Sequence, residues 1–402
     1  MRLAMCVGAS ACSLVSPAFA QGDLATARTD IRAAVTDAYE DNVLRLPKSA
    51  PVPANSARND YRFTPALNID VVRPIGLQSV FLNGNVGYDF YKRNKQLERE
   101  RINLEGGADL RFGGNCTQHL ALGYGRQQSD LRDVFNVVRL RNVEERKTAS
   151  FAASCSGLIG VKPGVTFDHT DVSNSDNSRE QGNYHANTFG GSLGYVSPAL
   201  GEVSLYASYR FGTYPNRSRI PGIRIREDIN VYNVGLRYSR SLGTRLRGNV
   251  SVGYTKVKPK LAGTAPFNGA SYSADITFVP TTQLQTVVGI SRSVNQSNLL
   301  QDSYSVDDSY HFGATYALSP FIRANVGAGF SRRKFKDSPI IGPTPFGSGD
   351  RTRQLSSGFG YTPPGKFSYA FDVAATKRSS ALRRFDYNYF VARLTVRFRL
   401  GV

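Results

Sequence analysis

Asp307, Ser309 and His311 are the residues whose types come closest to a catalytic set, because they supply a carboxylate, a hydroxyl and an imidazole. They stand two residues apart, so on a β-strand all three side chains share one face. Neighbours on that face lie about 6.5–7 Å apart, whereas a triad needs hydrogen-bond contact at about 2.6–3.2 Å. The sequence therefore predicts no enzyme, and a hydrolase that uses Ser309 is kept only as a third alternative. The spacing of the other histidines does not match a metal site, so no metal or cofactor is expected.

The amino-terminal segment predicts export. Residue 2 is arginine, an uncharged run follows, and Ala18-Phe19-Ala20 ends the segment in a small-x-small pattern. This arrangement is typical of a secretory signal peptide, here residues 1–20, with cleavage near Ala20. We expect residues 21–30 to form a short periplasmic lead, and residues 31–402 to form the folded domain.

The cysteines indicate a covalent link. Two of the four, Cys6 and Cys12, lie in the predicted signal, which leaves Cys116 and Cys155. In an oxidising compartment an even pair favours a disulfide. Two unpaired buried thiols are the alternative.

The elements that carry these residues are predicted to be β-strands. From residue 390 to residue 402 every even position is apolar and most odd positions are polar or cationic. The same alternation recurs back to about residue 31, in segments long enough for the tilted membrane crossing of a strand, which needs about 9–11 residues. No run approaches the roughly 18 apolar residues of a membrane helix. The pattern predicts an all-β, transmembrane, antiparallel up-and-down β-barrel of about 18 strands.

The connections support a barrel in the outer membrane of a Gram-negative cell. Short connections, around residues 73–76, 113–115, 157–160, 197–201, 240–244, 280–282, 318–320 and 363–365, alternate with long polar ones. Outer-membrane barrels have short periplasmic turns and longer external loops. A secreted β-sandwich or β-helix also has period-two strands, but neither needs long and short connections in strict alternation.

Charged residues on the polar faces of the strands are the candidates for lining the barrel lumen. The cationic candidates are Arg111, Arg210, Arg237, Arg247, Arg323, Arg393, Arg397 and Arg399, and the acidic ones are Asp109, Asp275 and Asp372. Opposed charges of this kind could brace the wall or line a hydrated path. The sequence leaves both interpretations open.

The formal net charge of +19 indicates anionic partners. The excess of cations gathers in the predicted outer loops and rims, for example at residues 217–226, 332–336 and 351–353. The phosphates of lipopolysaccharide in the outer membrane would attract such loops, and so would an acidic polysaccharide. Nucleic acid is not an expected partner of a protein that faces the cell exterior.

The run Tyr39-Glu40-Asp41-Asn42-Val43-Leu44-Arg45-Leu46-Pro47, followed by Asn59-Asp60-Tyr61 at the start of a long strand, resembles the opening of a family of outer-membrane β-barrel porins associated with exopolysaccharide export. The resemblance implies a polysaccharide substrate and periplasmic export machinery as partners. It implies no catalytic residue.

The sequence therefore predicts a passive outer-membrane channel for exported exopolysaccharide. The alternative is a general or anion-selective porin for small solutes, in which outer loops fold inward to form a narrow eyelet. The long segments 129–146 and 334–351 are the candidates for such loops.

Overall fold

A computed structural model describes residues 26–113, 115–129, 142–216, 227–296, 302–337, 349–381 and 383–400. Within these ranges the chain forms eighteen strands and three short 3-10 helices. The strands are β1 (Arg28–Glu40), β2 (Asp60–Ile75), β3 (Gln78–Tyr91), β4 (Arg99–Phe112), β5 (Cys116–Gln128), β6 (Val143–Cys155), β7 (Gly160–Asn174), β8 (Tyr184–Ser197), β9 (Gly201–Thr213), β10 (Ile229–Leu242), β11 (Leu246–Pro259), β12 (Phe267–Phe278), β13 (Leu284–Gln296), β14 (Asp302–Ala317), β15 (Ile322–Asp337), β16 (Gly349–Tyr361), β17 (Phe367–Ser380) and β18 (Tyr387–Arg399). The helices are η1 (Lys95–Leu97), η3 (Asn177–Gly182) and η4 (Arg383–Phe385).

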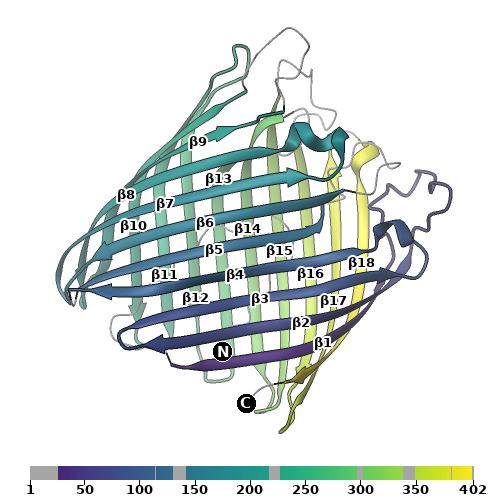
Figure 1. Cartoon of the computed structure of the whole chain (residues 1–402), viewed down its shortest axis with the longest axis horizontal. Coiled ribbons are helices and arrows are strands. Elements are labelled where there is room, and N and C mark those ends of the chain that lie inside the picture. The colour runs from purple at the N-terminus through teal and green to yellow at the C-terminus, as the bar shows by residue number, and fades with distance from the viewer. Residues whose placement is uncertain are drawn as a thin grey trace.

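The strands form one closed antiparallel barrel (Figure 1). Each strand pairs with its neighbours in the chain, and β1 pairs with β18 from Arg32 opposite Arg399 to Glu40 opposite Val391. Closure leaves no unpaired sheet edge, as a β-structure in lipid requires. The predicted fold class and the predicted strand number are confirmed. No helix in the described ranges is long and apolar enough to cross a membrane.

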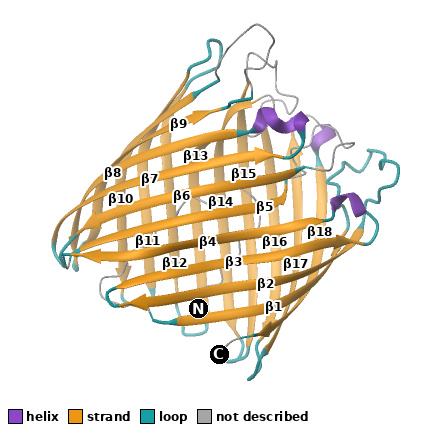
Figure 2. Cartoon of the chain, viewed as in Figure 1, coloured by secondary structure: helices purple, strands orange, loops and turns teal. Residues whose placement is uncertain are grey.

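The two ends of the barrel differ in their connections. The short turns gather at one end, and the long loops and the 3-10 helices gather at the other (Figure 2). Glycine makes three of the tight turns possible, because Gly76, Gly113 and Gly243 have φ of +64°, +57° and +59°. The first strand begins at Arg28, three residues before the predicted start of the domain at residue 31.

The alternation of the sequence places apolar side chains on the outer face. Leu120 and Leu122 are 40% and 69% exposed, whereas Ala121 between them is 7% exposed. A soluble protein does not expose apolar side chains all round its circumference, so this face is built for lipid. Aromatic pairs mark both borders of the apolar belt, for example Tyr209 with Tyr232 at the long-loop end and Phe367 with Phe398 at the short-turn end.

A disulfide joins two neighbouring strands at the short-turn end. Cys116 begins β5 and Cys155 ends β6, and the two residues stand directly opposite each other in the register. Their sulfurs are bonded, on the outer face of the sheet. The bond closes a separation of 39 residues in the chain.

Candidate functional site

The register places every predicted lumen residue on the inner face of the barrel. Asp372 stands opposite Arg393, for example, and Asp275 opposite Asn249. Residues opposite each other in the register lie on the same face of the sheet. By this criterion the inner face also carries Arg111, Arg210, Arg237, Arg247, Arg323, Arg397, Arg399 and Asp109. The candidates therefore share one surface, although they are distributed all round it.

Several of these side chains brace the wall. The Asp109 carboxylate lies 2.7 Å from the Nδ1 of His119, and the Asp275 carboxylate lies 3.6 Å from the Nε2 of His311. The guanidinium of Arg237 stands over the ring of Tyr206, 5.2 Å from its centroid. These contacts connect neighbouring strands and leave less of each charge free for a solute.

The Asp307, Ser309 and His311 side chains do not contact one another as a triad. The Ser309 hydroxyl is 2.9 Å from that of Ser291, and Asp307 accepts a hydrogen bond of 2.9 Å from Asn295. His311 faces Asp275 instead. Each of the three side chains thus contacts a residue on a neighbouring strand. The Ser309 hydroxyl therefore has no adjacent His311 base, as a nucleophile would need.

We single out six of the arginines on the inner face of four nearby strands, β1, β2, β4 and β18. We call this set the basic track: Arg32, Arg62, Arg101, Arg393, Arg397 and Arg399. Small residues stand opposite several of them, namely Ala38 opposite both Arg62 and Arg393, Ala34 opposite Arg397, and Gly87 opposite Arg101. The long arginine side chains therefore have space to extend over these small residues on the lumen face.

Half of the basic track is neutralised and half is not. Arg62 binds Glu40 at 3.0 Å and Asp89 at 2.9 Å, and Arg32 and Arg399 both contact Asp30. Arg101, Arg393 and Arg397 make no ion pair with any carboxylate in the described part of the chain. These three arginines therefore keep positive charge on the lumen face of the wall.

Sequence reasoning missed Arg32 and Arg101, although both have the parity of their polar neighbours Asp30 and Asn103. Arg101 lies within electrostatic range of Arg62 and Arg393. Closure of the barrel between β1 and β18 brings these residues together, and a linear pattern does not reveal that proximity.

Serine hydroxyls line the part of the inner face that is farthest from the basic track in strand order. Ser251 pairs with Ser273 at 2.8 Å, and Ser291 pairs with Ser309 at 2.9 Å. These four residues, which we call the hydroxyl wall, belong to β11, β12, β13 and β14. The lumen therefore has one side rich in arginine and another side where serine hydroxyls pair across the strands.

The long-loop ends of β13 and β14 bend inwards from the wall, while β14 stays paired with β15. The pairing between β12 and β13 stops at Tyr272 opposite Arg292, while β13 and β14 stay paired as far as Gln296 opposite Tyr304. Beyond Arg292 β13 is therefore released from β12, while β14 stays paired with β15 as far as Asp302 opposite Asp337. We call the described residues of this part, 293–296 and 302–307, the inner hairpin.

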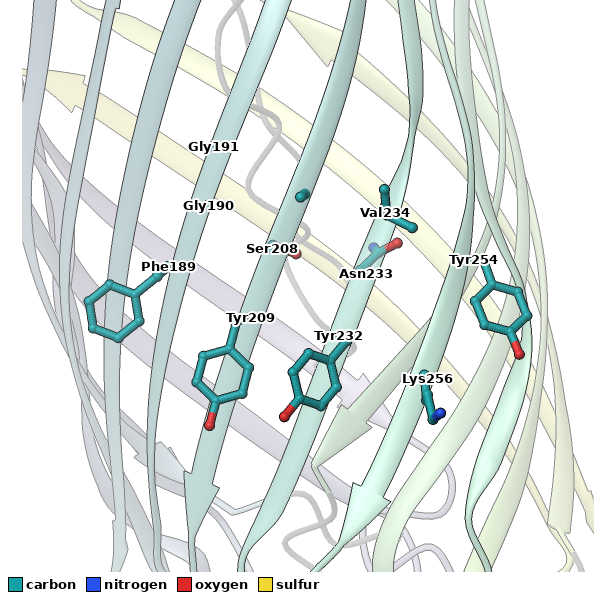
Figure 3. A pocket seen from close by; sticks show the side chains of 11 residues that line it. Phe189, Gly190, Gly191, Ser208, Tyr209, Tyr232, Asn233, Val234, Tyr254 and Lys256 are labelled. Atoms are coloured by element: carbon teal, nitrogen blue, oxygen red, sulfur yellow. The ribbon is translucent and has the colours of Figure 1, made fainter.

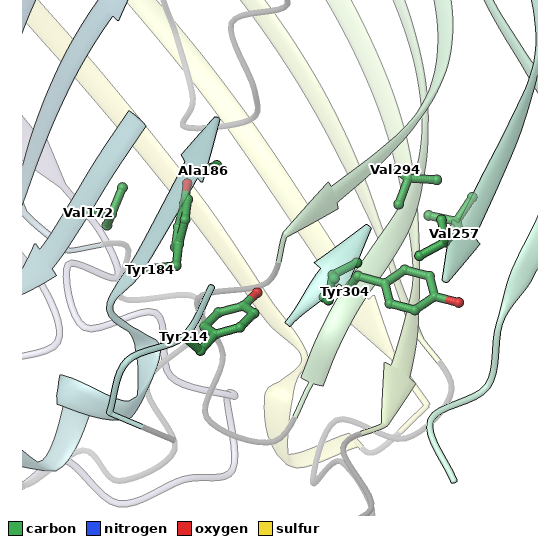
Figure 4. Packing of buried hydrophobic residues seen from close by; sticks show 9 residues of the cluster. Val172, Tyr184, Ala186, Tyr214, Val257, Val294 and Tyr304 are labelled. Atoms are coloured by element: carbon green, nitrogen blue, oxygen red, sulfur yellow. The ribbon is translucent and has the colours of Figure 1, made fainter. Parts of the chain in front are cut away.

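Burial shows where the inner hairpin lies. Val294 and Val306 share the parity of lipid-facing residues, yet they are only 8% and 4% exposed. They belong to one buried cluster with Val257 and Ile229, which are on the inner face of β11 and β10 (Figure 4). The inner hairpin thus lies on the lumen side of β10 and β11. Its apolar face packs against the inner face of these two strands.

Two hydrogen bonds hold the inner hairpin in this position. The Arg210 guanidinium, which projects from β9, donates to the carbonyl oxygen of Val294 at 3.4 Å. The Tyr304 hydroxyl donates to the carbonyl oxygen of Ala265 at 2.6 Å, and Tyr304 is fully buried. Arg210, a predicted lumen residue, thus braces the inner hairpin against β9.

The connection from β1 to β2, residues 41–59, also covers part of the inner face. The Arg45 guanidinium stacks on the ring of Tyr389, 3.0 Å from its centroid. Leu44 and Leu46 are buried in a cluster that packs against Tyr91. The Arg58 guanidinium fixes the loop by donating to three of its carbonyl oxygens. The long-loop mouth is therefore lined by inward-packed chain on two sides.

The segments predicted to form an eyelet were 129–146 and 334–351. Residues 130–141 and 338–348 lie outside the described residues, and so do 217–226 of the predicted basic loops. The inner hairpin was not predicted. A signal for it exists in hindsight, because Ile229, Val231 and Val257 are apolar at positions where the lumen face is otherwise polar.

The family described as "Putative beta-barrel porin 2" matches residues 165–400. No curated protein matches the chain significantly. Solved structures of similar fold include OccK2 (OpdF) of Pseudomonas aeruginosa in complex with glucuronate (TM-score 0.48, 10% identity, 95% of this chain and 100% of that one) and a BenF-like porin from Pseudomonas fluorescens Pf-5 (TM-score 0.48, 10% identity, 94% and 100%). Another is the siderophore receptor PirA from Acinetobacter baumannii (TM-score 0.46, 8% identity, 93% and 81%).

The matched residues reach from β7 to β18 and include the inner hairpin, the hydroxyl wall and the β18 arginines of the basic track. They amount to more than half of the chain, in a closed barrel with a lipid-facing outer surface. The protein belongs to this family of β-barrel porins and is an outer-membrane channel.

Proposed function

We propose that the barrel conducts small, water-soluble solutes passively across the outer membrane, with a preference for anions. The observation that carries this proposal is the inner hairpin, which occupies the lumen at the long-loop mouth. The basic track supplies the preference for negative charge.

The size limit follows from packing. A barrel of this strand number has a bore wider than its own wall side chains fill, so that an unobstructed lumen would admit large solutes. The inner hairpin reduces the bore, and it is held by buried valines, by Arg210 and by Tyr304 rather than lying loose at the rim. A fixed constriction selects solutes by size.

The charge preference follows from the positions of the unpaired arginines. Arg101, Arg393 and Arg397 face a water-filled path with walls of lower dielectric constant, which strengthens the attraction of an anion compared with bulk water. Asp372, near Arg393 and Arg397, offsets part of this charge. On the far side, the hydroxyl wall offers donors and acceptors that can replace the water around a polar solute.

Export of exopolysaccharide is the competing proposal. It is favoured by the lumen-facing ring of Tyr206, since aromatic faces can support sugar rings in a polysaccharide path, and by the resemblance at residues 39–61. It would require periplasmic export machinery as a partner and an outer mouth open to a polymer chain. The inner hairpin stands against such an opening, which is why we prefer small solutes.

Liposome swelling distinguishes the two proposals. Purified mature protein would be reconstituted, and swelling would be recorded in neutral mono-, di- and tetrasaccharides, in a sugar monocarboxylate and in a soluble polysaccharide. We expect entry rates to fall steeply above the disaccharide, and the carboxylate to enter faster than the neutral sugar of the same size. Equal rates for monosaccharide and tetrasaccharide, or entry of the polysaccharide, would reject the small-solute proposal.

A further inference from the structure

A hollow of about 610 Å³ lies on the outer, lipid-facing side of the barrel wall, across β8, β9, β10 and β11 (Figure 3). It is close to the long-loop end, at the level of the aromatic border. We call it the outer groove. The rings of Phe189, Tyr209, Tyr232 and Tyr254 and the Lys256 side chain at its rim stand on the lipid-facing side of the wall.

The register explains why the wall is hollow here. Gly191, Ala207 and Val234 stand side by side on neighbouring strands and form a row of small outward residues. In the next row towards the long-loop end, Phe189, Tyr209 and Tyr232 stand side by side and form a ridge of rings. A Cβ atom added at Gly191 would meet no atom within 4 Å, so the depression is open to its surroundings.

Lysines stand directly beyond the ring ridge. Lys256 lines the hollow, Lys258 follows it on the same face of β11, and Lys260 comes directly after the strand. The Lys258 ammonium lies 5.7 Å from the ring centroid of Tyr232. Lys260 is paired with Asp228 at 3.2 Å, whereas Lys256 and Lys258 are exposed and pair with no carboxylate in the described part of the chain.

We propose that the outer groove binds one phosphate-bearing glycolipid of the outer leaflet. An acyl chain occupies the apolar hollow over Gly191 and Ala207, and a headgroup phosphate lies between the Lys256 and Lys258 ammonium groups. The order of the features matches such a lipid: apolar surface nearest the bilayer centre, then rings at the interface, then cations at headgroup level.

A second copy of the chain fits the same surface less well. In a two-fold contact the same patch meets itself, so Lys256 and Lys258 of one copy would face the identical lysines of the other. Two unpaired cations on each side repel, whereas a phosphate between them neutralises both. We therefore commit to the lipid.

Native mass spectrometry of the full mature protein in detergent tests the proposal. The protein would be titrated with bisphosphorylated lipid A, with dephosphorylated lipid A and with phosphatidylcholine. We expect one tightly retained bisphosphorylated lipid per barrel, and binding about 30-fold weaker in Lys256→Gln/Lys258→Gln, since each cation near a membrane surface contributes about fivefold. Gly191→Leu fills the hollow and is also expected to lose the retained lipid.

Two control variants separate a site from general attraction. Lys377→Gln removes an exposed cation on β17, remote from the groove, and Gly248→Leu adds a lipid-facing side chain on β11 beyond the groove. Both should retain the lipid, and all variants should keep the circular dichroism of the folded barrel. The proposal would be overturned if Lys377→Gln lost as much bound lipid as the double variant, or if bisphosphorylated and dephosphorylated lipid A bound equally well. A protein dimer that Gly191→Leu dissociates would also overturn it.

Discussion

At the scale of single residues, the lumen arginines divide into structural and solute-facing groups. Arg62 is held by Glu40 and Asp89, and Arg210 holds the inner hairpin. Arg393 and Arg397 have no such ion pair and face the water of the channel. The sequence left wall bracing and selectivity as alternatives, and the contacts assign some arginines to each.

The unpaired arginines give the first prediction. Arg393→Gln/Arg397→Gln should lower the anion-to-cation permeability ratio several-fold, because two cations beside the ion path are removed. The ratio is measured from the reversal potential of reconstituted protein in a salt gradient. Lys377→Gln makes a charge change on the lipid face and should leave the ratio unchanged. An unaltered ratio in the double arginine variant would show that the basic track does not select ions.

The disulfide gives the second residue-scale prediction. Replacing both cysteines, in Cys116→Ser/Cys155→Ser, should lower the free energy of unfolding by roughly 2–4 kcal/mol, because the unfolded chain regains the entropy of an open loop. Urea unfolding in detergent micelles, followed by circular dichroism, measures the difference. Oxidised and reduced wild-type protein provide a matched pair with no substitution. If all of these forms unfold at one urea concentration, the bond makes no contribution to stability.

At the scale of elements, the inner hairpin is the feature that turns a wide barrel into a narrow channel. Its apolar face would contact lipid if the hairpin stayed in the wall, and it covers Ile229 and Val257 instead. Period two correctly predicts which face of β13 and β14 is apolar. It does not predict what that face contacts, because the contact depends on β12 ending its pairing early.

Breaking this contact should open the channel. Val257 is fully buried, so Val257→Asp places an unpaired charge in the cluster at a cost of several kcal/mol and should release the hairpin. We expect a larger single-channel conductance and faster swelling in tetrasaccharide solutions. Val257→Ile preserves the apolar contact and should behave as wild type. Should Val257→Asp conduct no more than Val257→Ile, the hairpin is not the constriction.

At the scale of the whole molecule, the protein has its apolar residues outside and its polar residues inside. Leu122 faces lipid near the middle of β5, whereas Ser150 faces the lumen opposite Ala121. Leu122→Arg should destabilise the barrel by about 2–4 kcal/mol in lipid, while Ser150→Arg should cost far less. Unfolding in lipid vesicles at increasing urea measures both variants. Equal costs would contradict the assignment of the two faces.

The sequence predicts most of this architecture because a strand in a barrel repeats one rule along its length. Alternation predicts the strands and the inner face of Arg393 and Asp372, and the even pair of cysteines predicts the bond between Cys116 and Cys155. The inner hairpin and the packing of Leu44 and Leu46 on Tyr91 were not predicted. The first is a contact between distant strands, and the second is a contact of the β1–β2 connection with the wall. Neither is contained in the local pattern of a single sequence.

The most direct test of a narrowed, anion-preferring channel is the single-channel current of the purified mature protein in a planar bilayer with a potassium chloride gradient. We predict discrete, stable current steps, and a reversal potential whose sign shows that chloride permeates faster than potassium. Membranes that stay electrically silent after verified insertion, or a reversal potential set by potassium, would contradict the account.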